Sequence, residues 1–314
     1  MRPTPAVSVQ GIGHEYGSRM ALTDLTFDVA PGEFVALLGP NGCGKTTLFR
    51  ILATLMRPTR GRASVLGADV GADPGAVRRR IGVTFQSPSL DGRLSVRENL
   101  MHHGHLYGLR GRELSARIDA GLEGVQLHDR SGDRVDQLSG GMRRRVEIAK
   151  SLLHEPDVLL MDEPSTGLDP AARRSLADLL AGLRRERGLT CLMTTHLMDE
   201  AEVCDRVAIL DRGRLAALDA PSALKACVGG EVVTVQAEDA GGVAARIREE
   251  FGLAPQETDR GLCIADPRGH ALAARLAERF GDQIRSITVS RPSLEDVFLR
   301  LTGRRFEGSG DMGG

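Results

Sequence analysis

Eight consecutive residues, Gly39–Thr46 (GPNGCGKT), have the composition and spacing of a phosphate-binding loop. The glycines let the main chain wrap closely around a polyphosphate with its N–H groups pointing inward, and a helix that follows adds a favourable field at its N-terminus. Lys45 would place a compact ammonium at the β- and γ-phosphates, and the Thr46 hydroxyl would reach Mg²⁺. The motif therefore predicts a nucleotide site formed by Gly39, Pro40, Asn41, Gly42, Cys43, Gly44, Lys45, Thr46 and Thr47.

A second motif with chemical potential is the acidic pair Asp162-Glu163, which directly follows the apolar run Val158–Met161. Adjacent carboxylates at the end of a buried strand are costly unless they have a task, because unpaired buried charge is unfavourable. We expect Asp162 to hold Mg²⁺ through water, and Glu163 to orient and polarise an attacking water molecule. The alternative is an acidic surface turn, which is disfavoured because the same chain contains a phosphate loop.

The composition indicates a soluble chain with balanced charge. Its 41 basic and 42 acidic residues leave a net charge of −1, which argues against nucleic acid or an anionic membrane surface as a partner. The sequence shows neither an apolar run of roughly 18 residues, as a transmembrane helix needs, nor a signal-peptide pattern. Five scattered cysteines without a CxxC pair indicate a reducing compartment and argue against zinc. We therefore expect a cytoplasmic protein.

Two details of composition bear on the phosphate loop. Only three of the basic residues are lysines, and the rest are arginines. The use of lysine at position 45 is therefore informative, because a planar guanidinium would fit poorly in the phosphate loop. Cys43, inside the loop, could be a redox-sensitive thiol or a small residue that fills space. The second interpretation is favoured.

Alternating strand and helix patterns must position these motifs. Apolar residues between Val7 and Val29 predict short strands around the turn-prone Gly17-Ser18. The continuous run Phe34–Leu38 predicts a strand buried on both faces, followed by a helix from about Gly44 that ends near Pro58 and includes Leu55 on its apolar face. Further buried strands at Val158–Met161 and Leu189–Met193 predict a mainly parallel sheet that is covered by helices and binds ligands at the carboxyl ends of its strands.

The remainder of the chain divides into helical and mixed regions. A mostly helical pattern from Ser87 to Arg134 predicts an inserted subdomain, taken as residues 87–150, and Val207–Leu218 reads as a hairpin. Gly229-Gly230 suggests a boundary between a domain of residues 1–228 and a small α+β domain of residues 229–303, whose last helix follows Ser293 in a near variant of the capping box. Residues 304–314 would form a flexible tail.

One further motif narrows the class. Leu138–Met142 (LSGGM) opens a helix and resembles the LSGGQ signature of ABC ATPases, and the other motifs of that family fall in order around it. Tyr16 resembles the aromatic residue that stacks on adenine, and Gln86 the Q-loop glutamine that senses Mg²⁺ and the transmembrane partner. Ser165–Asp169 resembles the D-loop, and His196 the switch histidine that contacts the γ-phosphate. The resemblance implies a P-loop ABC ATPase with an antiparallel β subdomain and a helical subdomain.

This resemblance assigns roles and partners. Ser139, Gly140, Gly141 and Met142 would contact the phosphates bound by a second cassette, so that ATP-bound dimers, either homodimers or heterodimers, are implied. Met142 departs from the family's glutamine, which removes one hydrogen-bonding side chain. The implied site residues are Glu163, His196 and Lys45 for catalysis, Thr46, Gln86 and Asp162 for Mg²⁺, Tyr16 and the phosphate loop for ATP, and Asp169 in the D-loop.

The C-terminal segment Pro292–Gly303 and the Met-Arg run after the signature resemble ATPases of daunorubicin-resistance-type drug export. This resemblance implies a separate six-helix permease, docked near Gln86–Asp91 and Leu100–Tyr107, with ATPase subunits on the inner face of the membrane. The C-terminal domain would then be a stabilising or dimerising unit rather than a regulatory sensor, and Arg143–Arg145 a mostly solvated helix face. The alternatives are an ABC ATPase of translation or DNA repair and a purely regulatory ATP-binding module.

Overall fold

The computed structural model describes residues 4–258, 260–304 and 306, and the tail expected to be flexible lies almost entirely outside these residues. The described chain forms two compact units, one reaching Leu218 and the other beginning at Asp219. Helix α8 (Pro221–Ala226) therefore belongs to the second unit, ahead of the boundary suggested by Gly229-Gly230. No helix within the described residues has the length and apolar character needed to cross a membrane.

A mainly parallel sheet forms the centre of the first unit. Its strand order is β10-β9-β3-β8-β7-β6, with β3 in parallel register with β8 and β9, and β7 with β6 and β8. Every residue of β3 and β7 is buried, as continuous apolar runs in a doubly covered sheet require. The strands are β3 (Phe34–Leu38), β6 (Ile81–Thr84), β7 (Val158–Asp162), β8 (Thr190–Thr195), β9 (Arg206–Asp211) and β10 (Arg214–Asp219).

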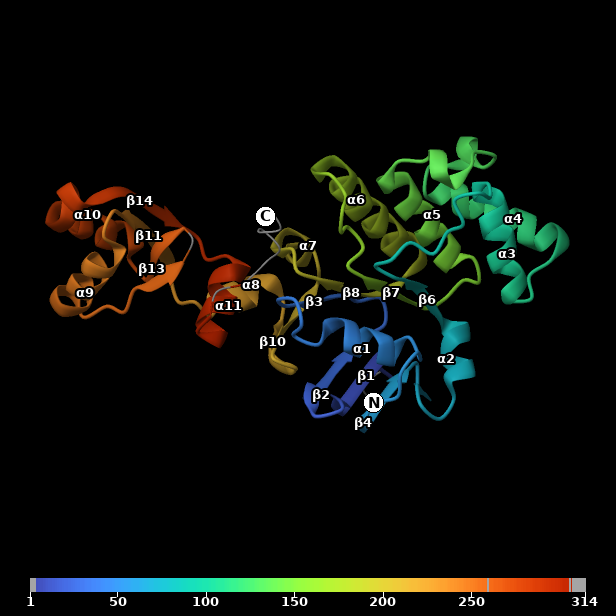
Figure 1. Ribbon diagram of the computed structural model, residues 1–314, viewed down its shortest axis with the longest axis horizontal. Coiled ribbons are helices and arrows are strands. Elements are labelled where there is room, and N and C mark those ends of the chain that lie inside the picture. The colour runs from blue at the N-terminus through green and yellow to red at the C-terminus, as the bar shows by residue number, and fades with distance from the viewer. Residues whose placement is uncertain (1–3, 259, 305, 307–314) are drawn as a thin grey trace. The chain divides into compact units, whose positions relative to one another are not determined.

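A second sheet of the first unit is antiparallel, in the order β2-β1-β4-β5, and lies beside α1 (Figure 1). The sequence pattern identified β1 (Val7–Tyr16) and β2 (Arg19–Val29) but not β4 (Arg60–Val65) or β5 (Ala68–Asp69). Arginines and a glycine occupy much of β4, so only its last residues show the alternation of a half-buried strand.

Helix α1 (Lys45–Leu52) is shorter than expected. The chain leaves the helix at Ala53, and Thr54 adopts a left-handed conformation with φ of 61°. Leu55 is therefore not on the buried face but 61% exposed. The prediction of a helix reaching Pro58 was wrong because a non-glycine residue in the left-handed region gives no sequence signal. The other helices around this sheet are α2 (Pro74–Arg80), α6 (Pro170–Arg187) and α7 (Met198–Glu202).

The helical region predicted from Ser87 onward consists of α3 (Val96–Leu106), α4 (Gly111–Gly124) and, after two 3-10 turns (His128–Arg130 and Val135–Gln137), α5 (Gly140–Leu152). The three helices gather to one side of the parallel sheet in Figure 1. A capping box between Ser95 and Glu98 begins α3. The shared apolar core includes Val96, Leu100, Leu114, Ile118, Leu122 and Val146.

The second unit is the α+β fold that the sequence pattern predicted. Its antiparallel sheet has the order β12-β13-β11-β14 and packs against two helices through Val233, Ile247, Leu276 and Phe280. The capping box expected at Ser293 is present and begins the last helix. The elements are β11 (Glu231–Ala237), α9 (Ala240–Phe251), β12 (Gln256–Thr258), β13 (Gly261–Asp266), α10 (Gly269–Phe280), the 3-10 turn Gly281–Gln283, β14 (Ile284–Ser290) and α11 (Leu294–Thr302).

Candidate functional site

The phosphate loop connects the end of β3 to the start of α1. Gly42 and Gly44 have φ angles of 76° and 110°, which glycine adopts without the steric cost that a Cβ brings. At Gly39 the restriction is space: a Cβ there would lie 2.5 Å from the carbonyl oxygen of Leu210 in β9. The residue types at these positions are thus set by main-chain geometry, as the sequence motif implies.

Lys45 is buried at the first position of α1, with 4% of its surface exposed. Its Nζ atom donates to the carbonyl oxygens of Gly39 at 2.6 Å and Pro40 at 3.1 Å and lies 3.8 Å from Oε1 of Glu163. The ammonium is therefore held within the loop and beside the acidic pair.

A cavity of about 300 Å³ opens at this loop. Tyr16, which is 45% exposed, lies at its margin, where a flat ring could meet a planar base. Arg19 also lines the cavity and was missed by sequence reasoning, because a surface arginine after a turn carries no distinctive signal. The lining residues are Tyr16, Arg19, Ala21, Asn41, Gly42, Gly44, Lys45, Thr46, Thr47 and Glu163.

Asp162, the last residue of β7, is buried and hydrogen-bonded. The Thr194 hydroxyl in β8 donates to its Oδ1 atom at 2.5 Å. Burial raises the pKa of Asp162, and the hydrogen bond from Thr194 and the charge of Lys45 act in the opposite direction. A nearby cation would favour the ionised carboxylate further.

Glu163 follows in a left-handed conformation with φ of 45°. Its N–H donates to the carbonyl oxygen and the hydroxyl of Thr194, at 3.1 Å and 3.0 Å. A non-glycine residue in this region costs free energy and persists only where its surroundings hold it. The turn directs the Glu163 side chain toward the phosphate loop rather than along the strand direction.

Side chains from separate segments converge on the Glu163 carboxylate. Nε2 of Gln86 lies 3.3 Å and the Thr166 hydroxyl 3.1 Å from Oε2, and both donate to it. Nδ1 of His196 is 3.2 Å from the same oxygen. Lys45 approaches the other oxygen. The structure thus brings together Lys45, Gln86, Glu163 and His196, which are four of the predicted site residues.

The signature and the D-loop each begin a helix. The Ser139 hydroxyl accepts a hydrogen bond from the N–H of Met142 at 3.2 Å and caps α5. Oδ1 of Asp169 accepts from the N–H groups of Ala171 and Ala172, both at 2.9 Å, and caps α6. Met142 packs against the helical core. The signature residues do not line the cavity at the phosphate loop.

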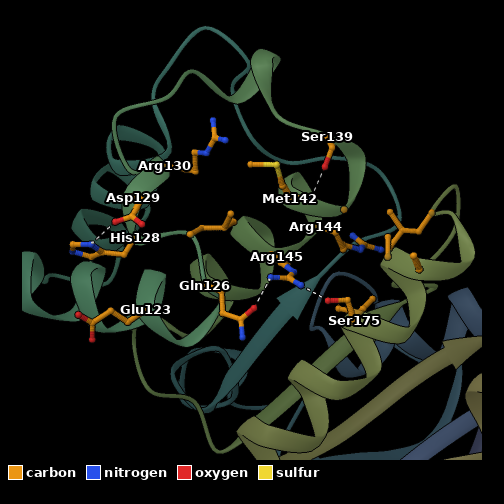
Figure 2. Close-up of a pocket in the computed structure, with 16 residues that line it drawn as sticks. Glu123, Gln126, His128, Asp129, Arg130, Ser139, Met142, Arg144, Arg145 and Ser175 are labelled. Carbon is orange, nitrogen blue, oxygen red and sulfur yellow. Dashed lines mark hydrogen bonds and ion pairs between the residues drawn. The ribbon is translucent and has the colours of Figure 1, made fainter.

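A separate cavity of about 800 Å³ lies beside the signature (Figure 2). Ser139, Gly141 and Met142 line one part of it, and the start of α6 lines another. Arg145 lies in the wall of this cavity and donates hydrogen bonds to the side chains of Gln126 and Ser175. The phosphate loop and the signature of this chain therefore line two separate cavities.

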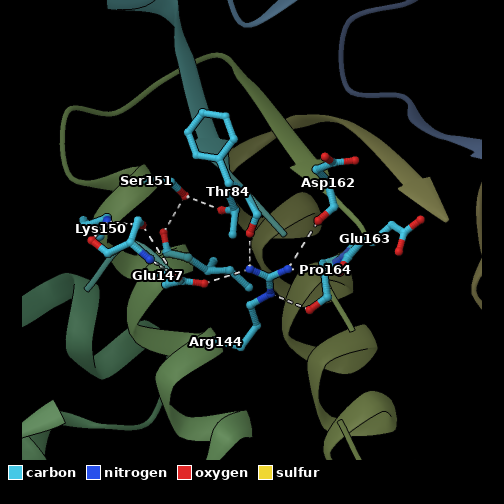
Figure 3. Close-up of polar contacts among 11 residues, drawn as sticks. Thr84, Arg144, Glu147, Lys150, Ser151, Asp162, Glu163 and Pro164 are labelled. Carbon is cyan, nitrogen blue, oxygen red and sulfur yellow. Dashed lines mark hydrogen bonds and ion pairs between the residues drawn. The ribbon is translucent and has the colours of Figure 1, made fainter. Parts of the chain in front are cut away.

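The arginine run after the signature differs from the expected solvated face. Arg143 is exposed, but Arg144 is only 7% exposed and donates to the main chain around Glu163 (Figure 3). Sequence reasoning missed Arg144 and its partner Glu147. The available signal was their i, i+3 spacing with opposite charge on one predicted helix.

Cys43 is 3% exposed, and burial raises the pKa of its thiol despite the nearby Lys45. A reactive thiol requires access and a lowered pKa, and Cys43 has neither. This geometry supports the interpretation of Cys43 as a small residue that fills space.

Comparison with known proteins decides the family. The family model described as ABC transporter matches residues 22–166. A daunorubicin resistance ATP-binding protein, DrrA3 of Streptomyces coeruleorubidus, is 42% identical over 95% of this chain and 96% of its own length. This chain belongs to the ABC transporter ATP-binding proteins. A Nod factor export ATP-binding protein I of Rhizobium sp. (strain N33) is 39% identical over 96% of this chain and 98% of that protein.

Solved structures agree with this ABC ATPase assignment. CbiO1 of Clostridium perfringens, part of an ABC transporter complex, superposes with a TM-score of 0.66 at 27% identity and covers 79% of this chain and 96% of its own. An ATP-binding subunit of an ABC transporter superposes with a TM-score of 0.64 at 32% identity, over 71% of this chain and 93% of its own. The α/β P-loop fold and the ATP-hydrolysing activity predicted from the sequence are thereby confirmed.

Proposed function

We propose that this ABC ATPase hydrolyses MgATP as one half of a dimer and drives export through a separate membrane permease. The observation that carries the proposal is the convergence of Lys45, Gln86, Thr166 and His196 on the Glu163 carboxylate. Such a cluster gives a water molecule near the γ-phosphate an acceptor for its proton and places cationic or polar groups around it.

The phosphate loop and the acidic pair suit MgATP. Main-chain N–H groups of the loop and Lys45 would bind the β- and γ-phosphates, while Thr46, Gln86 and Asp162 would hold Mg²⁺ directly or through water. Few protein side chains are needed for this, because Mg²⁺ takes most of its ligands from phosphates and water. The ion would neutralise charge on the phosphates.

The catalytic roles follow from position. Glu163 would orient the attacking water and accept its proton, and His196 would contact the γ-phosphate and the Glu163 carboxylate together. Tyr16, at the margin of the cavity, would stack on adenine.

The dimer follows from the separation of the two motifs. The signature residues would approach the γ-phosphate bound by a second copy, and Asp169 would lie at the interface between the two copies. These signature residues are Ser139, Gly140, Gly141 and Met142. The cavity of about 800 Å³ beside the signature supports the proposal that this surface is an interface, at which a second copy completes the site. We propose a homodimer, because one chain carries one full set of motifs.

The export direction and the permease rest on the relatives, whose names state drug resistance and Nod factor export. The expected permease contact includes Leu100–Tyr107, where Leu106 is 83% exposed and Met101 and Tyr107 are each 37% exposed. Apolar side chains of this kind suit a partner helix. The subunit would lie on the cytoplasmic face of the membrane through that permease.

Replacing Glu163 with glutamine tests the catalytic proposal. Glu163→Gln should bind ATP normally and lose about 10²–10⁴-fold in turnover, because glutamine cannot accept the proton. Glu186→Gln, on the exposed end of α6, is the matched control and should retain activity. ATP affinity and phosphate release are measured on both. Full turnover by Glu163→Gln would refute the assignment.

Mixing two inactive variants tests the dimer. Lys45→Met destroys the phosphate loop and keeps the signature, whereas Ser139→Arg does the reverse. If the signature acts across the dimer, each heterodimer contains one intact composite site. In an equal mixture about half of all dimers are heterodimers, so about a quarter of the wild-type rate should return. No recovery in a mixture shown by cross-linking to contain heterodimers would contradict the proposal. Pull-down of a membrane protein from native membranes, rather than ribosomes or DNA, would support the transporter role.

A further inference from the structure

Arg144 lies on the signature helix α5 with all five of its N–H donors engaged. A guanidinium carries five donors in a fixed planar arrangement. In the described structure each donor has its own acceptor, and four of the five acceptors are main-chain carbonyl groups. These acceptors are the carbonyl oxygens of Phe85 (2.6 Å), Asp162 (3.4 Å), Glu163 (3.0 Å) and Pro164 (2.5 Å), and Oε2 of Glu147 (2.7 Å).

Three of these carbonyl groups belong to the consecutive residues 162–164, which surround the left-handed Glu163. Arg144 therefore holds the peptide groups before and after the residue whose conformation directs the proposed catalytic carboxylate. Figure 3 shows the guanidinium between these carbonyl groups on one side and Glu147 on the other. The Glu163 side chain itself points away from Arg144, toward the cluster that contains Lys45 and His196.

The same helix also holds the segment that follows β6. Phe85, which accepts from Arg144, directly precedes Gln86. Oε1 of Glu147 accepts from the N–H of Ser89 at 2.7 Å. Nζ of Lys150 donates to the Ser89 carbonyl oxygen at 3.0 Å and to its hydroxyl at 2.5 Å. Arg144, Glu147 and Lys150 thus connect α5 to the main chain at residues 162–164 and to the segment that carries Gln86.

We infer that Arg144 is a positioning residue: it holds the main chain at Glu163 and at Gln86 in the geometry needed for hydrolysis and couples both to the signature helix. This inference rests on the proposed role of Glu163. The guanidinium touches neither the phosphate loop nor the Glu163 carboxylate, so it acts through the main chain. Lysine cannot replace it, because an ammonium has three donors around one nitrogen and cannot reach acceptors spread along a planar fork.

Kinetics separate positioning from general structural support. Arg144→Lys keeps the charge, and Arg144→Met keeps much of the volume. Both should lower kcat about 10- to 100-fold with ATP affinity within about twofold of wild type, because the phosphate loop is unchanged. Arg112→Gln, an exposed arginine of α4, is the control and should leave kcat unchanged. Wild-type kcat in both Arg144 variants would overturn the inference.

A double variant identifies the residue through which Arg144 acts. If Arg144 acts by positioning Glu163, then Arg144→Met should lower the residual rate of Glu163→Gln by less than about twofold, since the group that it positions is already disabled. If the loss of kcat in the double variant instead equals the product of the losses in the two single variants, the inference is overturned. If Arg144→Met does not fold, Glu147→Gln takes its place in the same cycle, because it removes the carboxylate that orients Arg144 without emptying the site.

These outcomes differ from a failure of the proposed function. Full turnover in Glu163→Gln would refute the catalytic proposal itself. Loss of turnover in Glu163→Gln combined with normal turnover in the Arg144 variants would refute only the positioning role.

Discussion

Gly39 has no room for a methyl group, which makes Gly39→Ala a quantitative test of the structure. An added Cβ would lie 2.5 Å from the Leu210 carbonyl oxygen and 2.6 Å from the Cys43 Sγ atom, about 1 Å short of ordinary contact. The nearer neighbour is main chain of β9, which is paired with β3 and cannot rotate away. Overpacking of this kind costs about 1–3 kcal/mol, and we expect the upper part of that range.

Two further glycines calibrate the result. At Gly42 the nearest atom is 3.8 Å away, so Gly42→Ala meets only the cost of its φ of 76°, about 1–2 kcal/mol. Gly182 lies within α6 and has open space around it, so Gly182→Ala should stabilise the protein by up to about 1 kcal/mol. Stability should therefore fall in the order Gly182→Ala, wild type, Gly42→Ala, Gly39→Ala.

The assay can follow the ATPase unit alone. The chain has two tyrosines and no tryptophan, and both Tyr16 and Tyr107 belong to the first unit. Urea unfolding followed by tyrosine fluorescence therefore reports the free energy of unfolding of that unit. Binding of ATP by the folded variants provides a second measurement, which should weaken for both loop variants and not for Gly182→Ala. A Gly39→Ala protein as stable as Gly42→Ala would refute the steric argument.

Two other predictions concern titratable groups. Burial lowers the pKa of His103 to about 4, and its Nε2 atom has no hydrogen-bond partner within the described residues. As the pH falls below about 6.5, the unfolded chain protonates this histidine while the folded chain does not, so the free energy of unfolding should decrease. Between pH 7.5 and pH 5 the decrease should be about 2 kcal/mol larger in wild type than in His103→Leu. Urea unfolding at both pH values measures this difference, and identical losses in the two proteins would contradict it. Iodoacetamide should modify the exposed Cys227 of the folded protein first, since Cys43 and the other cysteines are buried and burial raises the pKa of Cys191 to about 12. Peptide mass spectrometry identifies the modified residue, and equally rapid labelling of Cys43 would count against its buried position.

Contiguous patterns were sufficient for much of the fold. The runs Phe34–Leu38 and Val158–Met161 predicted buried strands, because a strand covered on both faces has no polar side of its own. Short or polar elements escaped this reasoning. Strand β6 has four residues, β4 begins with arginine and glycine, and α1 ends at residues that carry no stop signal. Pairing with neighbouring strands, rather than local preference, stabilises such segments.

The amino-acid sequence by itself determined the phosphate loop and the acidic pair as motifs, because each is a run of adjacent residues whose types and spacing are visible without the fold. Only the tertiary structure decided which distant groups meet. The positions of Gln86 and His196 at Glu163 depend on the order of β6, β7 and β8 in the sheet. Likewise, three consecutive arginines are alike in sequence, and only the packing of α5 against the end of β7 buries Arg144 among carbonyl groups that need its donors.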